Sequence, residues 1–269
     1  MKKNISTLAT IVAGFAFVLP LHAEETKPLK ALLITGGCCH DYAAQKDILK
    51  KGIESRANII VDQIHTDDST IKPDLPIYGL PEYAEGYDVV IHDECAAGIS
   101  EDVTVKGVLA PHKAGMPGVN LHCAMHSYRI GDFKKPLEEL GTPTSQWFEY
   151  IGIQSTGHGP KKPISVVFTD KEHPVTMHSE DWKTGNEELY NNVKVLDTAH
   201  TLASGKQGKE TAVVVWTNDY NGTRVFNTTL GHFNETVEDA RYLDLVTRGI
   251  LWACGKMDDE GVIAEGYGK

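Results

Sequence analysis

Short apolar runs alternate along the first half of the chain with longer segments that carry apolar residues at helical spacing. The apolar runs end at glycine or polar residues and cover 30–35, 58–64, 87–92 and 118–121. Continuous apolar runs of this length are typical of strands buried on both faces of a parallel sheet. The segments 42–56 and 100–114 lie between them and have the pattern of helices. This alternation predicts βαβ units and a mainly parallel sheet.

The second half predicts more strands than helices. Residues 212–217 and 223–229 flank the turn signal Asn-Asp-Tyr-Asn-Gly and predict a hairpin. Residues 133–140 predict a short helix, and apolar residues at helical spacing predict a closing helix over 237–253. Further predicted strands lie at 163–169 and 192–198, and a proline-containing surface loop is predicted at 66–85.

The amino-terminal segment has the organisation of a secretory signal peptide. Lys2 and Lys3 precede an apolar stretch, and Ala23 follows as a small residue at a cleavage position. A retained membrane anchor is the alternative, but the stretch is short for a span of ~20 residues and Pro20 closes it. We therefore expect cleavage of residues 1–23 and a periplasmic or secreted protein.

The rest of the chain predicts one domain. No linker, repeat or low-complexity tract divides it, so we expect one α/β domain over 24–256 and a tail at 257–269. The net charge is −11 without long runs of one sign, which argues against nucleic acid or an anionic membrane as a partner. A small molecule is the expected ligand, with no membrane association after signal cleavage.

Five cysteines are an odd number for an exported chain. Adjacent Cys38 and Cys39 cannot easily pair with each other, so we expect no disulfide scaffold and at least one free thiol. Cys254, at the end of the closing helix, has the position of a small buried hydrophobe.

Histidine and cysteine residues follow several predicted strands. His40 comes after the glycines that end the first strand, and His122 and Cys123 follow the strand at 118–121. His158 lies between two glycines, and His232 follows the hairpin. Because parallel strands present their carboxyl ends at one edge of a sheet, we expect these four histidines to converge on a pocket there.

Imidazoles in a partly buried pocket suit either a divalent metal such as zinc or proton transfer near neutral pH. No short ligand spacing such as H-E-x-x-H marks a metal site, so sugar hydrogen bonding and a structural role stay open as well. Cys123, on a strand-to-helix turn, can be a nucleophile with a lowered pKa or simply a small residue that fits a tight turn.

Carboxylates could complete this chemistry. Glu188, in the motif E-E-L-Y, can act as a general acid or base or as a metal ligand. Asp41 and Glu94 are candidate partners, because glycoside chemistry commonly needs two carboxyl groups. The alternatives are a helix N-cap for Asp41 and a solvated loop position for Glu94.

Arg129 is a candidate for binding an anionic group, and three tryptophans are candidate stacking platforms for a sugar ring. Core packing is the favoured role for Trp216, whereas Trp147 and Trp182 are expected nearer to a ligand.

The motifs taken in order resemble the ThuA-like (trehalose utilisation) family. They are GG-x-x-H, the strand end with His122, H-P-V-T, E-E-L-Y, V-V-V-W-T with T-R-V-F-N-T-T-L-G-H-F, and L-W-A-C-G, spread over 30–255. The resemblance implies the class I glutamine amidotransferase-like superfold, a flavodoxin-like three-layer α/β/α sandwich with its site at the carboxyl ends of the strands. It implies a role in sugar catabolism, often beside oxidoreductases that make 3-keto sugars. The site residues that it implies are His40, His122, His158, Glu188 and His232.

The chain departs from this family at Cys123, where the family usually has a small residue and the amidotransferases have their nucleophilic cysteine. We expect an exported hydrolase or lyase that acts on a sugar or keto-sugar, with a sugar oxidoreductase as a pathway partner. Self-association into a homo-oligomer is an open alternative. A non-catalytic carbohydrate-binding protein and a cysteine-dependent amidotransferase-like hydrolase are the alternatives. The expected catalytic residues are His122, His232, Glu188 and Cys123, and the expected substrate-binding residues are His40, Asp41, His158, Trp147 and Arg129.

Overall fold

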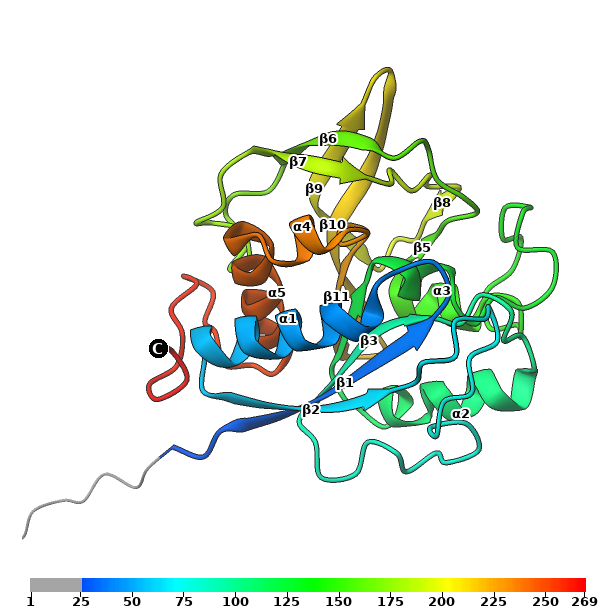
Figure 1. The fold of residues 1–269 in the computed structure, drawn as a ribbon, viewed down its shortest axis with the longest axis horizontal. Coiled ribbons are helices and arrows are strands. Elements are labelled where there is room, and N and C mark those ends of the chain that lie inside the picture. The colour runs from blue at the N-terminus through cyan, green and yellow to red at the C-terminus, as the bar shows by residue number, and fades with distance from the viewer. Residues whose placement is uncertain (1–25) are drawn as a thin grey trace, which may run out of the picture.

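A nine-stranded sheet runs through the protein (Figure 1). The computed structural model describes residues 26–269, so the expected signal peptide lies outside the described residues. The strand order is β2-β1-β3-β4-β11-β10-β9-β6-β7, and β5 pairs with β8 in a separate ribbon. No helix within 26–269 has the length and apolar character needed to cross a membrane.

Five neighbouring strands of the sheet run parallel. Both faces of this part are covered, which explains why its inner strands are buried along nearly their whole length. The predicted strands of the first half and the second strand of the hairpin are confirmed. The parallel strands are β1 (Leu29–Gly37), β2 (Ile59–His65), β3 (Val89–Cys95), β4 (Gly118–Leu121) and β11 (Thr223–Thr228).

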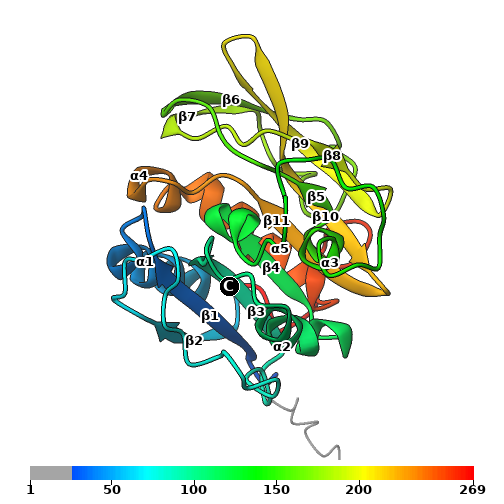
Figure 2. The same ribbon diagram turned by 90° about the vertical axis from the view of Figure 1, so that its right-hand side faces the viewer.

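Helices cover both faces of the sheet (Figure 2). α1 (Tyr42–Arg56) and α5 (Ala240–Ala253) pack together on one face, where they form the larger hydrophobic core. α2 (Asp102–Lys113) and α3 (Gln146–Ile151) lie on the other face over a second core. Two short elements carry site residues, the 3-10 helix η1 (His122–His126) and α4 (Asn234–Val237). The predicted helices at 42–56, 100–114 and 237–253 are confirmed, the last of them from residue 240 onward.

The rest of the sheet is antiparallel. The predicted hairpin is confirmed as β10 and β11, and the sheet continues beyond β10 through further antiparallel strands. These strands are β10 (Glu210–Tyr220), β9 (Ala199–Gln207), β6 (Lys162–Phe168) and β7 (Trp182–Glu187), and the separate ribbon is β5 (Ile153–Gln154) with β8 (Lys194–Val195).

Several local predictions differ from the structure. The helix predicted at 133–140 is absent, because the Gln154 amide donates to the carbonyls of Phe133 and Lys135 and accepts from the N–H of Leu137 in an irregular turn. The strand predicted at 192–198 is reduced to β8. β7 and β9 were not predicted, because their sequences are largely polar and their pairing comes from neighbouring strands.

The carboxyl ends of β1, β3, β4 and β11 lie side by side along the same end of the sheet, since these strands are parallel neighbours. A Cβ atom at Gly37 would overlap the backbone carbonyl of Cys95, so glycine allows the end of β1 to approach the end of β3. This end of the sheet holds the candidate site.

Candidate functional site

Three histidines from separate strand ends lie together at this end of the sheet. His40 follows β1, His122 follows β4 and His232 follows β11. The ring centroids are 4.7 Å apart for His40 and His122, 4.6 Å for His40 and His232, and 5.3 Å for His122 and His232. One ring nitrogen from each lies within 4.8 Å of the others, so the expected convergence of these three residues is confirmed.

His122 is fixed in one orientation. Its Nδ1 lies 2.6 Å from the carbonyl oxygen of Thr229, which can only accept, so Nδ1 carries the proton. Its backbone has a φ of 39°, in the left-handed region where non-glycine residues are uncommon. The other ring nitrogen, Nε2, lies 3.3 Å from the Tyr190 hydroxyl and 3.3 Å from Nδ1 of His232. In the neutral ring, Nε2 is therefore free to accept a proton or a metal.

Glu188 is a nearly buried carboxylate among these rings. Its Oε2 lies 3.4 Å from Nδ1 of His232 and 3.6 Å from Nε2 of His122. Its Oε1 lies 3.6 Å from Nδ1 of His158 and 3.7 Å from Nζ of Lys161. Burial on its own would raise the pKa of Glu188, but hydrogen bonds and charge from His122 and His232 hold that pKa well below its ordinary value. Glu188 is therefore ionised at neutral pH.

Glu187 positions His232 and was missed in the sequence. Its side chain is fully buried, and its two carboxylate oxygens accept the backbone N–H of His232 at 3.0 and 3.1 Å. The paired acidic residues of E-E-L-Y were the available signal. They could not show which of the two faces the histidines, because Glu187 is the last residue of β7 and the regular strand pattern ends there.

His40 differs electrostatically from its neighbours. Burial and the charges of His122 and His232 lower the pKa of His40 to about 2. Its Nδ1 lies 3.4 Å from the carbonyl oxygen of His232. His40 is therefore neutral over the physiological pH range, which suits it to donate or accept hydrogen bonds or to ligate a metal rather than to act as an acid.

A cavity of about 670 Å³ opens beside the histidines. His40 and His232 reach its wall, whereas His122 and Glu188 lie behind them. Phe233, 37% exposed, is an aromatic residue of the wall that the sequence did not single out. The remaining lining residues are Cys39, Asp41, Lys161, Asn186, Asn234 and Glu235.

His158 lies on the other side of Glu188. It lines a separate cavity of about 530 Å³ together with Tyr190, and it does not line the first cavity. Its side chain is partly exposed, and its Nδ1 lies 2.9 Å from the carbonyl oxygen of Gly159. The fourth histidine thus reaches the same carboxylate but not the same cavity.

The donor set fits a divalent metal. Three neighbouring imidazoles and a carboxylate match the ligands that zinc takes in proteins. His40, His122, His232 and Glu188 are the residues that could hold it.

Other expected ligand residues lie elsewhere. Trp147 is in the core, 1% exposed, with Nε1 donating to the carbonyl of Ala124, so the expectation of a stacking platform there was wrong. Trp216 is fully buried, as predicted. Arg129 is buried with its guanidinium carbon 4.0 Å from the ring centre of Phe133, and it does not line the histidine cavity.

The two further carboxylates have different environments. Asp41 is the N-cap of α1 and accepts from the amide of Asn234 at 2.8 Å, and it also lines the histidine cavity. Glu94 is fully buried, so the solvated loop position considered for it was wrong. Its Oε1 lies 2.8 Å from Nδ1 of His92 and accepts from the Tyr128 hydroxyl at 2.6 Å.

The cysteines pair more extensively than expected. Cys38 is bonded to Cys39, so the expectation that these neighbours do not pair was wrong. Cys95 is bonded to Cys123, which leaves Cys123 without the free thiol that a nucleophile needs. Cys254 is a free thiol, which confirms the prediction that at least one cysteine is unpaired.

Comparisons with known proteins agree with this architecture. A family model described as "ThuA: Trehalose utilisation" matches residues 30–253. A ThuA-like protein from Parabacteroides merdae is 21% identical with a TM-score of 0.63, over 85% of this chain and 90% of that chain. A ThuA-like protein from Bacteroides uniformis is 17% identical with a TM-score of 0.58, over 87% and 95%. At these identities the structures show the fold alone.

A glutamine amidotransferase from Thermotoga maritima is also similar, with 10% identity and a TM-score of 0.43 over 77% of this chain and 76% of that chain. No match is found among curated proteins. The expected α/β/α architecture, with a parallel part of the sheet carrying the site, is confirmed, and the two ThuA-like proteins share this fold.

Proposed function

Because this chain belongs to the ThuA (trehalose utilisation) family, we propose that it is an exported hydrolase or lyase that acts on a sugar or keto-sugar. The family match supports a carbohydrate-related role. The observation that carries the catalytic part of the proposal is the buried carboxylate of Glu188 between His122 and His232, beside an open cavity. Pairs of titratable groups arranged in this way are typical of acid and base catalysis.

The cavity suits a sugar in size and lining. A volume of about 670 Å³ lies within the usual range for small-molecule sites. Asp41, Lys161 and Asn186 offer donors and acceptors for hydroxyl groups. Phe233 offers an aromatic face on which the apolar side of a sugar ring can stack, the role that we had expected of a tryptophan.

His232 is the proposed base. Its Nδ1 faces Glu188, so the carboxylate favours the tautomer with the proton on Nδ1 and leaves Nε2 to take a proton from the substrate or from a water molecule. Glu188 then stabilises the imidazolium that forms, as a carboxylate does in a catalytic triad. In a keto-sugar, the C–H bond next to the ketone is acidic enough for removal by such a base.

His122 is the proposed second proton carrier. Its proton on Nδ1 is held by Thr229, and Nε2 lies 3.3 Å from Nδ1 of His232. A proton can therefore pass between the two rings while Glu188 stays ionised. The leaving oxygen of the sugar needs a proton as its bond breaks, and His122 can return the proton through His232, which lines the cavity.

A divalent metal would use the same residues. His40, His122, His232 and Glu188 would hold the ion, which would polarise a carbonyl or hydroxyl oxygen of the sugar. Elemental analysis of the purified protein decides between the metal-assisted and metal-free forms.

Turnover of disaccharides and their 3-keto derivatives, followed by mass spectrometry, tests the proposal. We expect product formation by the wild type, near-complete loss in His232→Ala, and no loss in His178→Ala, whose side chain is exposed and outside both cavities. Binding of these sugars without any turnover would instead make the protein a carbohydrate-binding protein and overturn the catalytic proposal.

A further inference from the structure

We propose that Cys38, Cys39 and Cys95, in their reduced form, bind a thiophilic d10 metal ion, zinc(II) or copper(I). This sulfur site lies beside the cluster of His40, His122 and His232 and does not depend on the proposed sugar chemistry. Soft thiolate ligands select these ions over the harder magnesium and calcium.

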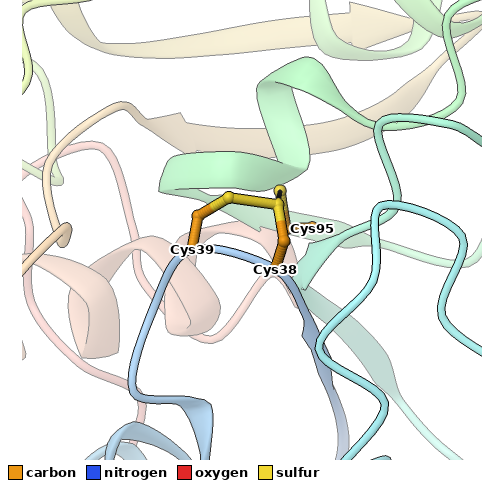
Figure 3. Close-up of side chains that lie close together, drawn as sticks. All are labelled: Cys38, Cys39 and Cys95. Carbon is orange, nitrogen blue, oxygen red and sulfur yellow. Dashed lines mark hydrogen bonds between the residues drawn. A yellow bond between two sulfur atoms is a disulfide. The ribbon is translucent and has the colours of Figure 1, made fainter.

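The three sulfur atoms lie together although they come from two strand ends (Figure 3). Cys38 and Cys39 follow β1, and Cys95 is the last residue of β3. All three Sγ atoms lie within 4.8 Å of one another, and those of Cys38 and Cys95 are 3.5 Å apart. With zinc–sulfur bonds of about 2.3 Å, sulfur atoms around a tetrahedral ion lie about 3.8 Å apart, which is close to this spacing.

The backbone is arranged to hold these sulfurs in place. Gly37, with a φ of 95°, lies directly against the carbonyl of Cys95 and brings the two strand ends together. Cys39 has a φ of 83°, in the left-handed region that non-glycine residues rarely adopt. An unfavourable backbone conformation of this kind at a reactive residue is typical of a functional site.

Two further ligand residues lie near Cys95. Cys95 also forms a potential ligand group with Cys123 and His40, whose ligand atoms lie within 4.8 Å of one another. Cys95 and Cys123 are buried, whereas Cys39 is exposed and lines the histidine cavity, so an ion can enter from that side. The ion would thus be bound partly inside the protein.

Tyr42 is a second observation that points to a ligand. Its ring packs against Cys95 and Cys123, and it is 4% exposed. Its hydroxyl has no hydrogen-bond partner among the described residues. A buried hydroxyl without a partner is costly, and a thiolate within its reach would accept its hydrogen bond.

Disulfide and metal-bound forms are alternative states of the same sulfurs. In the structure, Cys38 is bonded to Cys39 and Cys95 to Cys123. A dithiol reductant gives each disulfide two electrons and two protons and itself becomes a disulfide. The ion then displaces the protons of the thiols that ligate it.

Metal uptake by the reduced protein tests this inference. The protein is reduced with a dithiol without oxygen, freed of reductant, and loaded separately with zinc(II) and copper(I). We expect the sulfur atoms to hold one ion per chain, in addition to any ion that the histidines bind, by elemental analysis after gel filtration. Cobalt(II) in place of zinc should give sulfur-to-cobalt charge-transfer absorption.

Variants locate the ion. Cys95→Ser and the exposed Cys39→Ser should lose the ion and the absorption, whereas Cys254→Ser and His122→Ala should keep both. Circular dichroism checks the fold, and Cys39→Ser decides the matter if Cys95→Ser does not fold. An ion that persists in Cys39→Ser but is lost in His122→Ala would belong to the histidine group and overturn the inference. If reduction has freed all four thiols of the two disulfides and the protein still takes up no metal ion, the inference is overturned as well.

Discussion

The carboxylate of Glu188 lies 3.4 Å from Nδ1 of His232, so the two side chains form a buried acid–imidazole pair next to the open cavity. Glu187, the preceding residue, binds the backbone N–H of the same histidine. Two consecutive carboxylates therefore hold one histidine, one by its main chain and the other by its ring. This arrangement gives His232 a fixed tautomer and a fixed position.

Glu188→Gln should test the charge of this pair. The amide keeps the shape of the side chain but cannot stabilise an imidazolium, so we expect kcat to fall by about 10²-fold to 10⁴-fold with little change in KM. Steady-state kinetics on the sugar that the wild type turns over measures the change. His178→Gln is the control, and equal kcat values for Glu188→Gln and wild type would exclude a catalytic carboxylate.

Phe233→Ala should test the sugar platform. Loss of one stacking face costs about 1 kcal/mol, so we expect KM or Kd for the sugar to rise about fivefold with kcat nearly unchanged. Phe233→Trp should keep the affinity. Leu140→Ala, an exposed apolar residue outside the cavity, is the control for nonspecific effects. A fall in kcat without a change in affinity would contradict this role.

The convergence of the histidines was predictable because it follows from topology. Parallel strands with short polar ends must present those ends at one edge, so the positions of His40 and His122 after their strands were sufficient. The hairpin signal before His232 placed the third ring. Glu188 was a candidate through its E-E-L-Y motif and the family resemblance, since nothing in its spacing showed that it would point into the site.

Other features depend on contacts that a sequence does not show. Trp147 and Phe233 are both aromatic, but tertiary packing decides which of them is exposed. Trp147 is buried against aromatic side chains and the carbonyl of Ala124, whereas Phe233 follows β11 in a turn at the cavity wall. The pairing of Cys95 with Cys123 requires the close packing of neighbouring strand ends. The polar strand β9 exists because β10 offers it an edge, and intrinsic propensity does not predict it.

A buried histidine outside the site should make stability fall in mild acid. His112 is fully buried, and burial together with the charge of His92 lowers its pKa to about 3. The unfolded chain takes up a proton near 6.5, while the folded protein does so only near 3. Proton uptake by the unfolded chain therefore lowers the free energy of unfolding as the pH falls below about 6.5. For this residue the decrease is about 2 kcal/mol between pH 7 and pH 5.

Urea unfolding at pH 7 and pH 5 measures this effect in the wild type and in His112→Gln. Glutamine can keep hydrogen bonds to its neighbours but does not titrate, so we expect the loss of stability between the two pH values to be smaller by about 2 kcal/mol in the variant. His178→Gln should leave the difference unchanged. An identical pH dependence in wild type and His112→Gln would show that His112 is not responsible.

Gly37→Ala should test how closely the ends of β1 and β3 must approach. The new Cβ would overlap the carbonyl of Cys95, and a φ of 95° is unfavourable for alanine, so we expect a loss of about 2 kcal/mol in the free energy of unfolding. The displaced strand end should also make the cysteines of the reduced protein react faster with an alkylating agent. Gly107→Ala, inside α2 with free space around it, should instead stabilise the protein by up to about 1 kcal/mol. Urea unfolding compares the two variants, and a Gly37→Ala protein as stable as Gly107→Ala would show that the strand ends can separate without cost.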